Sequence, residues 1–236
     1  MKKIAMLTFF LLSLISCSDD DNDKTGSISV LLPETIDVVN AQGETHYQFA
    51  YDSARRIKTM IITGANNLAA TYLYNEDNLV TSVNLLDNDA PTEMRFEYDA
   101  DNRLKKYING NNIQQLTYNE TTQTYTIEGL GDMGFTANGD IASIGTTTIE
   151  YTDMPGVFRN IGGTNMNLIN FFIDGIFMYS GGYSSMEQIS VGGEVVIKMA
   201  HTLDANGFPI KSVSTQPAHP DRTAEMTIKY SSFPTN

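Results

Sequence analysis

Residue types that support the commonest enzyme chemistries are scarce in this chain. Its 236 residues include no tryptophan, one cysteine and three histidines. The histidines, His46, His201 and His219, are far apart and form no ligand-spaced pair, so we expect surface or strand positions rather than a metal site. A G-x-S-x-G nucleophile turn and an H-E-x-x-H metal motif are both absent. The missing tryptophan counts against sugar binding, because that ring stacks best on sugars.

Basic residues are also few, with 15 lysines and arginines against 28 aspartates and glutamates, for a net charge of −13. Such a surface repels nucleic acid and anionic lipid headgroups and favours neutral or cationic partners. We therefore expect no nucleic-acid partner. The carboxylates are too numerous to indicate a catalytic pair, since glycoside hydrolysis needs two of them at a fixed separation that a sequence does not show.

Long apolar runs are absent except at the N-terminus. Lys2 and Lys3 precede an apolar run from Ile4 to Ile15, which is too short to cross a bilayer core of roughly 30 Å as a helix. The run ends in Leu-Ile-Ser-Cys at Cys17, a pattern that resembles the lipobox of bacterial lipoproteins. In a lipobox the thiol of the cysteine is acylated, and the cysteine becomes the first residue after the signal peptide is cleaved. The alternative is an ordinary secretory signal with a chance cysteine.

A lipobox predicts three segments: a signal peptide over 1–16, an acidic tether over 17–26 and one β domain over 27–236. Cleavage would leave 13 basic and 28 acidic side chains, a net charge of −15. Acylation of Cys17 leaves no thiol, which excludes disulfides, cysteine-ligated zinc and a cysteine nucleophile. The acyl chains, palmitate included, would anchor the protein to the membrane without spanning it.

The tether reads Ser-Asp-Asp-Asp-Asn-Asp-Lys over 18–24 and should be solvated and unfolded. It fails as a calcium loop, because Lys24 and Val30 stand where glycine and glutamate are needed. It resembles the acidic tether of Bacteroidota lipoproteins, which directs export to the outer face of the outer membrane. The resemblance implies a cell-surface location; a periplasmic tether is the alternative.

A degenerate ten-residue motif recurs along the chain. Copies start at positions 51, 74, 98, 118, 135 and 203, and the first five are separated by 23, 24, 20 and 17 residues. The second residue is aspartate or asparagine in five copies, which suits an Asx-turn, and the fifth is asparagine or glycine in four, which suits positive φ. Arg55 and Thr122 break the second rule, so we expect looser turns there. The pattern indicates an array of β-hairpins.

The segments that flank these turns alternate between apolar and polar residues, as in 94–98 and 195–203. The alternation predicts an all-β fold, a curved antiparallel meander or open barrel-like sheet of about 12–14 short strands. One segment differs. Residues 165–179 are apolar on a helical period, with Thr164 or Asn165 as a candidate cap, and we expect a buried helix that plugs the concave face of the sheet. A membrane-dipping or partner-binding helix is the alternative.

The repeat unit Y-D-x-x-[GN]-[RL]-[LV] resembles the tyrosine-aspartate repeat of Rhs-type and wall-associated proteins. The layout of lipobox, acidic tether, degenerate repeats, apolar insert near residue 170 and a final hairpin pair is similar to an uncharacterised family of Bacteroides-type lipoproteins with a porin-like β fold. The resemblance implies a curved antiparallel meander around a short helix. It implies no transmembrane pore, because the strands show no lipid-facing apolar band with aromatic girdles.

The glycine pattern of a dinucleotide-binding site is present, but the structural context that it requires is not expected. Gly129, Gly131 and Gly134 spell G-x-G-x-x-G, but another hairpin motif follows where a helix would have to begin. We expect no cofactor, no metal and no enzymatic activity.

Three functions stay open at this point. The first is a non-enzymatic surface module that binds a glycan or a protein partner, with Tyr183 and Tyr107 as candidate ligand-stacking residues. The second is a purely structural or interaction lipoprotein with no small ligand. The third, least favoured, is a hydrolase with dispersed acidic residues.

Overall fold

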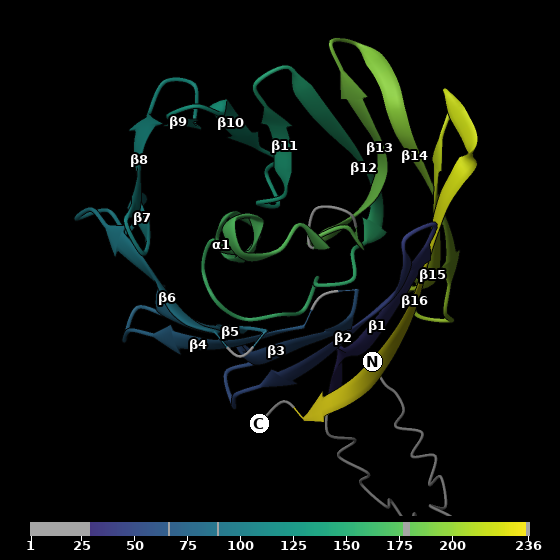
Figure 1. The fold of residues 1–236 in the computed structure, drawn as a ribbon, viewed down its shortest axis with the longest axis horizontal. Coiled ribbons are helices and arrows are strands. Elements are labelled where there is room, and N and C mark those ends of the chain that lie inside the picture. The colour runs from purple at the N-terminus through teal and green to yellow at the C-terminus, as the bar shows by residue number, and fades with distance from the viewer. Residues whose placement is uncertain (1–28, 66, 89, 177–179, 235–236) are drawn as a thin grey trace, which may run out of the picture.

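The protein forms a closed barrel of antiparallel strands with one helix inside it (Figure 1). The structure is a computed structural model and describes residues 29–65, 67–88, 90–176 and 180–234. Sixteen strands are found in this described part, and every strand pairs with its neighbours in chain order. They are β1 (Ser29–Asn40), β2 (Gly43–Tyr51), β3 (Ile57–Gly64), β4 (Leu68–Tyr74), β5 (Val80–Asp87), β6 (Ala90–Tyr98), β7 (Leu104–Asn109), β8 (Asn112–Asn119), β9 (Thr124–Ile127), β10 (Gly131–Phe135), β11 (Ile141–Ile144), β12 (Thr147–Pro155), β13 (Ser184–Val191), β14 (Glu194–Leu203), β15 (Pro209–Gln216) and β16 (His219–Pro234).

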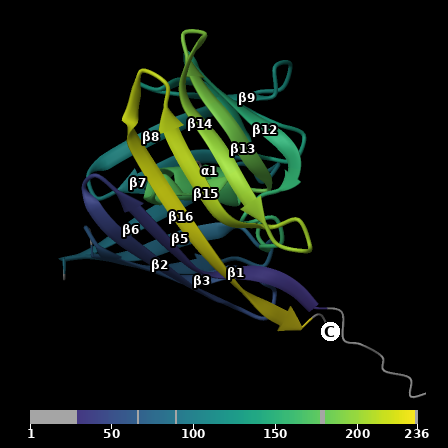
Figure 2. The same ribbon diagram turned by 90° about the vertical axis from the view of Figure 1, so that its right-hand side faces the viewer.

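The first and last strands close the barrel. β1 pairs with β16 from Ser29 opposite Pro234 to Val39 opposite Glu225. Both ends of the chain therefore leave the barrel at the same end, as Figure 2 shows for the C-terminus beside β1. Among the described strands, closure leaves no unpaired edge that a second chain could extend.

The all-β fold predicted from the sequence is confirmed, with more strands than the 12–14 expected. Four-residue strands such as β9 and β11 are too short to show an alternating pattern, so the sequence undercounts them. Closure also differs from the open form that we considered first, because it depends on the pairing of β1 with β16, which lie almost 200 residues apart.

Alternating burial explains why these segments are strands. In β6, for example, Met94 and Phe96 face the core while Arg95 faces solvent. Inward side chains of this kind form one apolar core that lines the barrel, and it includes Leu32, Ile57 and Met60, none of which is exposed. Outward side chains are mostly polar or charged. The arrangement is that of a barrel with an apolar interior and a mostly polar exterior.

The predicted core helix is confirmed, but it is shorter than expected. α1 (Met166–Ile173) lies in the middle of the barrel in Figure 1, with Met166, Leu168 and Ile169 almost wholly buried. It ends at Asp174, whose backbone is extended, so Gly175 follows the helix rather than interrupting it. Of the predicted range 165–179, residues 177–179 lie outside the described part.

The predicted helix cap is wrong in its chemistry. Asn165 is the residue before the first turn, but its backbone is left-handed, with φ 58°, and its side chain caps no helical N–H. The Asn165 side-chain amide is therefore not used in capping the helix and is available for other hydrogen bonds.

The two ends of the barrel differ. The connections after even-numbered strands, such as 52–56, 75–79 and 99–103, carry the repeat's Asp or Asn, and we call this the Asp-turn end. The long connection that contains α1 follows β12, so it also enters from this end. The opposite, far end carries the short connections β1–β2, β7–β8 and β15–β16.

Candidate functional site

The repeated Asp or Asn builds the same turn in each well-formed copy. In Asp99, Oδ1 accepts hydrogen bonds from the N–H groups of Asp101 and Arg103, both at 2.9 Å, and Asn102 has φ 62°. The hydrogen bond from Arg103 N–H lowers the pKa of Asp99. The same side-chain bonds are made by Asp52, Asn75 and Asp204. The acidity of the repeat therefore serves the turn, as the sequence predicts.

Two turns were expected to be looser, and one of these predictions is wrong. Arg55 takes the left-handed conformation itself, with φ 63°, and its turn is as tight as the others. Asp52 also binds the Arg56 side chain, with Nε 2.7 Å from Oδ2, which holds the turn closed. The expectation is confirmed at Thr122, because the left-handed residue of that longer turn is Gln123.

Five tyrosines tie neighbouring strands together at the Asp-turn end. Tyr51, Tyr74 and Tyr98 begin copies of the repeat, whereas Tyr151 and Tyr230 lie outside the six copies. Each donates its hydroxyl hydrogen to a carbonyl oxygen near the start of the adjacent odd-numbered strand, at 2.7 to 2.9 Å: Tyr51 to Pro33, Tyr74 to Ile57, Tyr98 to Val80, Tyr151 to Ile141 and Tyr230 to Pro209. Burial raises the pKa of each of these tyrosines, so the hydroxyls remain protonated donors. In the first three copies, therefore, the tyrosine and the aspartate or asparagine that follows it are both structural.

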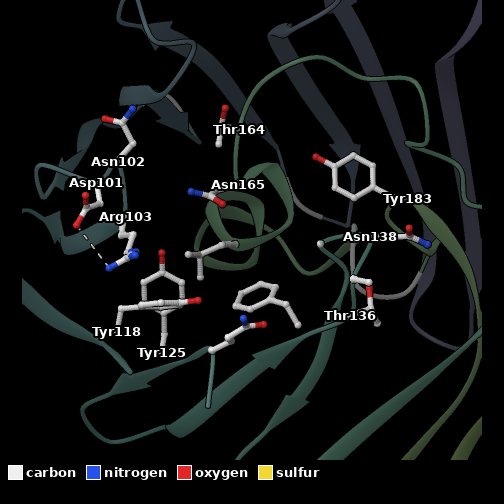
Figure 3. A pocket seen from close by; sticks show the side chains of 15 residues that line it. Asp101, Asn102, Arg103, Tyr118, Tyr125, Thr136, Asn138, Thr164, Asn165 and Tyr183 are labelled. Atoms are coloured by element: carbon white, nitrogen blue, oxygen red, sulfur yellow. Dashed lines mark ion pairs between the residues drawn. The ribbon is translucent and has the colours of Figure 1, made fainter. Parts of the chain in front are cut away.

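A cavity of about 640 Å³ opens at the Asp-turn end, between the turns of the middle repeats and the start of α1 (Figure 3). Its volume lies in the range of small-molecule sites in proteins. The wall combines aromatic rings with amide and hydroxyl groups, and its side chains include Asn102, Arg103, Tyr118, Gln123, Tyr125, Phe135, Thr136, Asn138, Thr164, Asn165 and Tyr183.

Arg103 forms one side of this cavity and is held rigidly. Its guanidinium lies 4.6 Å from the centre of the Tyr118 ring and pairs with Glu120 and, at 3.7 Å, with Asp101. The Tyr118 ring also packs edge-on against Tyr125, with ring centres 5.0 Å apart. These contacts fix the aromatic wall while leaving the Tyr118 hydroxyl without a hydrogen-bond partner in the described part of the chain.

Tyr183 stands on the opposite side of the cavity in Figure 3. A buried carboxylate behind it sets its position, because Asp140 Oδ1 accepts a hydrogen bond of 2.6 Å from the Tyr183 backbone N–H and one of 3.0 Å from the Asn167 amide. Burial, and then the charge of Asp140, raise the pKa of Tyr183 to about 12. The hydroxyl is therefore a neutral donor and acceptor at physiological pH.

The two stacking candidates have different positions. Tyr183 lines the cavity, as a ligand-stacking residue must. Tyr107 is only 7% exposed, and its ring stacks on Phe172 of α1 with centres 4.7 Å apart and also packs against Phe96. The assignment of Tyr107 as a ligand-stacking residue is therefore corrected: it is a core residue that locks the helix to the sheet.

The histidines and the glycine motif noted in the sequence have structural positions. His201 Nε2 donates a hydrogen bond of 2.7 Å to Met186 O, and its Nδ1 is bonded to Ser212 Oγ at 2.8 Å. His46 pairs with Asp37 across β1 and β2. Over the described ranges no group of three His, Cys, Asp or Glu side chains is placed to hold a metal ion. Gly131 and Gly134 lie in strand β10, which continues into the predicted hairpin.

Sequence reasoning missed most of the cavity wall. Arg103 and Gln123 belong to turns, and Asn138 and Asn165 belong to segments that meet only when the barrel closes around α1. The one available signal was that turn residues of successive repeats must gather at one end of a hairpin array. Cys17 and the tether lie outside the described residues. Among the described residues, no helix is long and apolar enough to cross a membrane.

The chain resembles proteins of known structure from Bacteroides. A porin-like protein from Bacteroides uniformis is 12% identical, with a TM-score of 0.44, over 84% of this chain and 98% of that one. A porin-like protein from Bacteroides vulgatus is 9% identical, with a TM-score of 0.43, over 86% and 99%. A search of curated proteins found no match.

The repeats themselves match a known sequence family. The profile described as Teneurin YD-shell matches residues 29–177, which include the first five copies of the motif and α1. The predicted tyrosine-aspartate repeats are confirmed by this match. The chain belongs to the Teneurin YD-shell family.

Proposed function

We propose that the protein is a lipoprotein, anchored to the outer membrane through Cys17 and exposed at the cell surface, that acts as a non-enzymatic binding module. Its ligand is a neutral glycan, held in the cavity at the Asp-turn end. The observation that carries this proposal is the composition of the cavity wall, in which aromatic faces and unpaired amides converge on a space of about 640 Å³.

The chemistry of the wall suits a sugar. The apolar C–H face of a sugar ring packs on an aromatic ring, and the rings of Tyr118 and Tyr183 stand on two sides of the cavity. Sugar hydroxyls need partners that both donate and accept, which side-chain amides do. The amides of Asn102, Gln123 and Asn165 make no side-chain hydrogen bond within the described residues, so they are free to bind.

Charge supports a neutral ligand. Arg103 is the basic residue of the cavity wall, and its guanidinium is already paired with Asp101 and Glu120. An anionic ligand would have to displace these carboxylates and would meet a chain of net charge −13. The phenol, hydroxyl and amide groups that remain do not change protonation state near neutral pH, which favours binding over acid–base catalysis.

The outer surface of the barrel supports anchoring by lipid alone. Lys58, Arg95, Glu187 and Lys229 point outward from four different strands and are exposed. Charges at the hydrocarbon centre of a bilayer cost about 2–4 kcal/mol each. Residues 17–28, if extended, reach up to about 40 Å, enough to hold the barrel clear of the lipid surface.

The binding proposal is tested by titrating the protein with a panel of neutral oligosaccharides and polysaccharides, using calorimetry and thermal unfolding. At 100 times Kd a true ligand stabilises the fold by about 2.7 kcal/mol. Tyr183→Ala and Asn102→Gly should each weaken binding at least about tenfold, as expected for loss of one stacking ring or one amide. Glycine accepts the positive φ of Asn102, so that change removes only the amide.

Phe208→Ala is the matched control, because Phe208 also lies in a turn at the Asp-turn end but packs on Tyr230 away from the cavity. It should lower stability and leave glycan affinity unchanged. A panel in which no glycan binds, or in which all three variants lose affinity equally, would contradict the proposal.

Anchoring is tested separately. Palmitate labelling and membrane fractionation should show acylation in the wild type and loss of both label and membrane attachment in Cys17→Ala. Protease added to intact cells should digest the protein, and complete protection would place it on the periplasmic side.

An interaction lipoprotein without a small ligand is the second candidate. One row of outward residues favours it: Ile61 lies opposite Ala69, which lies opposite Leu86, so three apolar side chains adjoin across β3, β4 and β5. Ile61 and Leu86 are 41% and 43% exposed. If no glycan binds while Leu86→Glu abolishes co-purification of a partner protein, this candidate replaces the first.

A further inference from the structure

A second cavity, of about 400 Å³, lies at the far end of the barrel. Asn40 and Gln216, the last residues of β1 and β15, place it there, away from the cavity of the Asp-turn end. Its wall includes the apolar side chains of Val38, Ile176, Ile197, Met199, Ala224 and Met226, together with the neutral polar side chains of Asn40, Thr45, Tyr47, Ser214 and Gln216.

One carboxylate stands in this wall. Asp174 directly follows α1, and its Oδ1 accepts a hydrogen bond of 2.8 Å from the Ile176 backbone N–H. The Tyr47 hydroxyl is 3.4 Å from the same oxygen, longer than a normal O–H···O bond. Oδ2 accepts no hydrogen bond in the described part of the chain, and it is not among the side-chain atoms enclosed by protein. It is therefore accessible from the cavity.

The local charge is negative and uncompensated. Asp174 follows the C-terminus of α1, where the helix dipole is negative, and the last turn of α1 contains no basic residue. No lysine, arginine or histidine is among the described residues that line the cavity. Desolvation raises the pKa of Asp174, a sign that the ionised form lacks solvent and counter-charge.

We propose that this cavity binds a protonated primary amine with an aliphatic chain, the ammonium group paired with Asp174 and the chain packed along Met199, Met226 and Ile197. An ammonium group supplies the positive charge that balances the carboxylate and the negative end of the helix dipole. It also donates hydrogen bonds to the free Oδ2 of Asp174. Among the described lining residues, Asp174 alone is charged, so a second charge on the ligand would have no partner in the wall. This site is independent of the glycan site, which lies at the other end of α1.

The test uses the purified protein with ¹³C-labelled methionine methyl groups and three probes of one shape: octylammonium chloride, 1-octanol and sodium octanoate. The Met199 and Met226 signals, assigned with Met199→Leu and Met226→Leu, should shift saturably with octylammonium. Its Kd should be about tenfold or more below that of 1-octanol, because a charge-assisted hydrogen bond exceeds a neutral one by about 1.4 kcal/mol. Octanoate should bind least.

Asp174→Asn keeps an acceptor for the Ile176 N–H and removes the charge. In this variant octylammonium should lose its tenfold preference, while retained 1-octanol binding shows that the cavity is intact. Glu76→Gln, the same charge change in an exposed turn at the Asp-turn end, should leave the preference unaltered. The proposal is overturned if octanoate binds as tightly as octylammonium, if Asp174→Asn keeps the preference, or if Met199 and Met226 do not respond.

Discussion

At the scale of single residues, the tyrosine and the aspartate of a repeat satisfy different backbone groups. The aspartate accepts from two N–H groups inside its own turn, whereas the tyrosine donates to a carbonyl oxygen of the neighbouring strand. The first interaction is local and can be read from ten residues. The second joins residues about 10 to 21 positions apart, and the sequence did not predict it.

The contribution of one tyrosine hydroxyl to stability can be measured by removing a single oxygen atom. Tyr98→Phe removes the 2.7 Å hydrogen bond to the carbonyl oxygen of Val80, a fully buried residue. The free energy of unfolding should fall by about 1–2 kcal/mol in urea denaturation, because a buried acceptor loses a partner. Tyr118→Phe removes a hydroxyl with no hydrogen bond to the described residues and should cost less than about 0.5 kcal/mol. Equal effects would argue against a structural role for the Tyr98 hydroxyl.

Asp140 is a residue that sequence reasoning did not single out, since it resembles any other turn aspartate. It is 1% exposed, and its Oδ2 and the Asn167 Oδ1 both lack partners in the structure. Desolvation raises the pKa of Asp140 despite several hydrogen bonds that lower it. Both unpartnered atoms are acceptors while the carboxyl is ionised, so protonation of Asp140 supplies a donor at this buried position.

The raised pKa sets a pH dependence. The folded state binds the Asp140 proton more tightly than the unfolded chain does, so stability falls as pH rises from about 4, the ordinary pKa, through the folded-state pKa. Asp140→Asn cannot ionise and its amide can donate to Asn167. It should be more stable than the wild type by about 1 kcal/mol at pH 7, with the difference shrinking below pH 4. Thermal unfolding across pH 3–8 checks this, and a variant less stable at pH 7 would contradict it.

At the scale of elements, hairpins were predictable and the helix was predictable in part. Turn chemistry is local, which is why the left-handed positions Asn78, Asn102, Gly139 and Gly207 were all correctly predicted. Arg55 was not, because the energy that holds an arginine at φ 63° comes from Asp52 contacts that only the folded turn makes. The helix was recognised by its apolar period, but its end at Asp174 was not marked by any residue pattern.

α1 stabilises the barrel by filling it. Leu168 and Ile169 are buried, Tyr107 stacks on Phe172, and the Tyr72 hydroxyl donates a 2.6 Å hydrogen bond to Asn170 Oδ1. A closed sheet of this size encloses more space than its own side chains fill, so the helix acts as part of the core.

Truncation of a buried side chain in α1 should therefore lower the free energy of unfolding as much as truncation of a buried side chain in a strand. Ile169→Ala, at a position with no exposure, should lower the free energy of unfolding by about 2–5 kcal/mol. Ile113→Ala, the same change at a side chain 57% exposed on β8, should cost less than about 1 kcal/mol. A small effect at Ile169 would mean that α1 does not pack inside the barrel in solution.

At the scale of the whole molecule, barrel closure rests on the pairing of β1 with β16. No local pattern encodes this contact, which explains why the sequence predicted a curved meander or an open barrel-like sheet and did not predict closure. Closure also assembles the far-end cavity, since residues of β1, β2, β14, β15 and β16 line it jointly. Of the two stacking candidates, only Tyr183 lines a cavity. The other wall residues come from turns, strands and α1, which are too distant in sequence to associate beforehand.

Closure is tested with a cross-strand disulfide. Val39 lies opposite Glu225 in the β1–β16 register, within the Cα separation that disulfides need. With Cys17 replaced by serine, Val39→Cys with Glu225→Cys should oxidise readily to a monomer of altered gel mobility. The control pair, Val39→Cys with Glu93→Cys on β6, should remain reduced. Cross-linking of the control pair, or none in the first, would contradict a closed barrel.

The central claim is that the cavity at the Asp-turn end binds a neutral glycan. Its most direct test is ¹⁹F NMR of the protein with 3-fluorotyrosine at its 12 tyrosines, with signals assigned by single Tyr→Phe changes, during titration with the glycan panel. The account predicts that at least one glycan shifts the signals of Tyr118 and Tyr183 saturably, while Tyr72, buried against α1, stays unchanged. Titrations that leave both Tyr118 and Tyr183 unmoved, or that shift only tyrosines remote from the cavity, would contradict it.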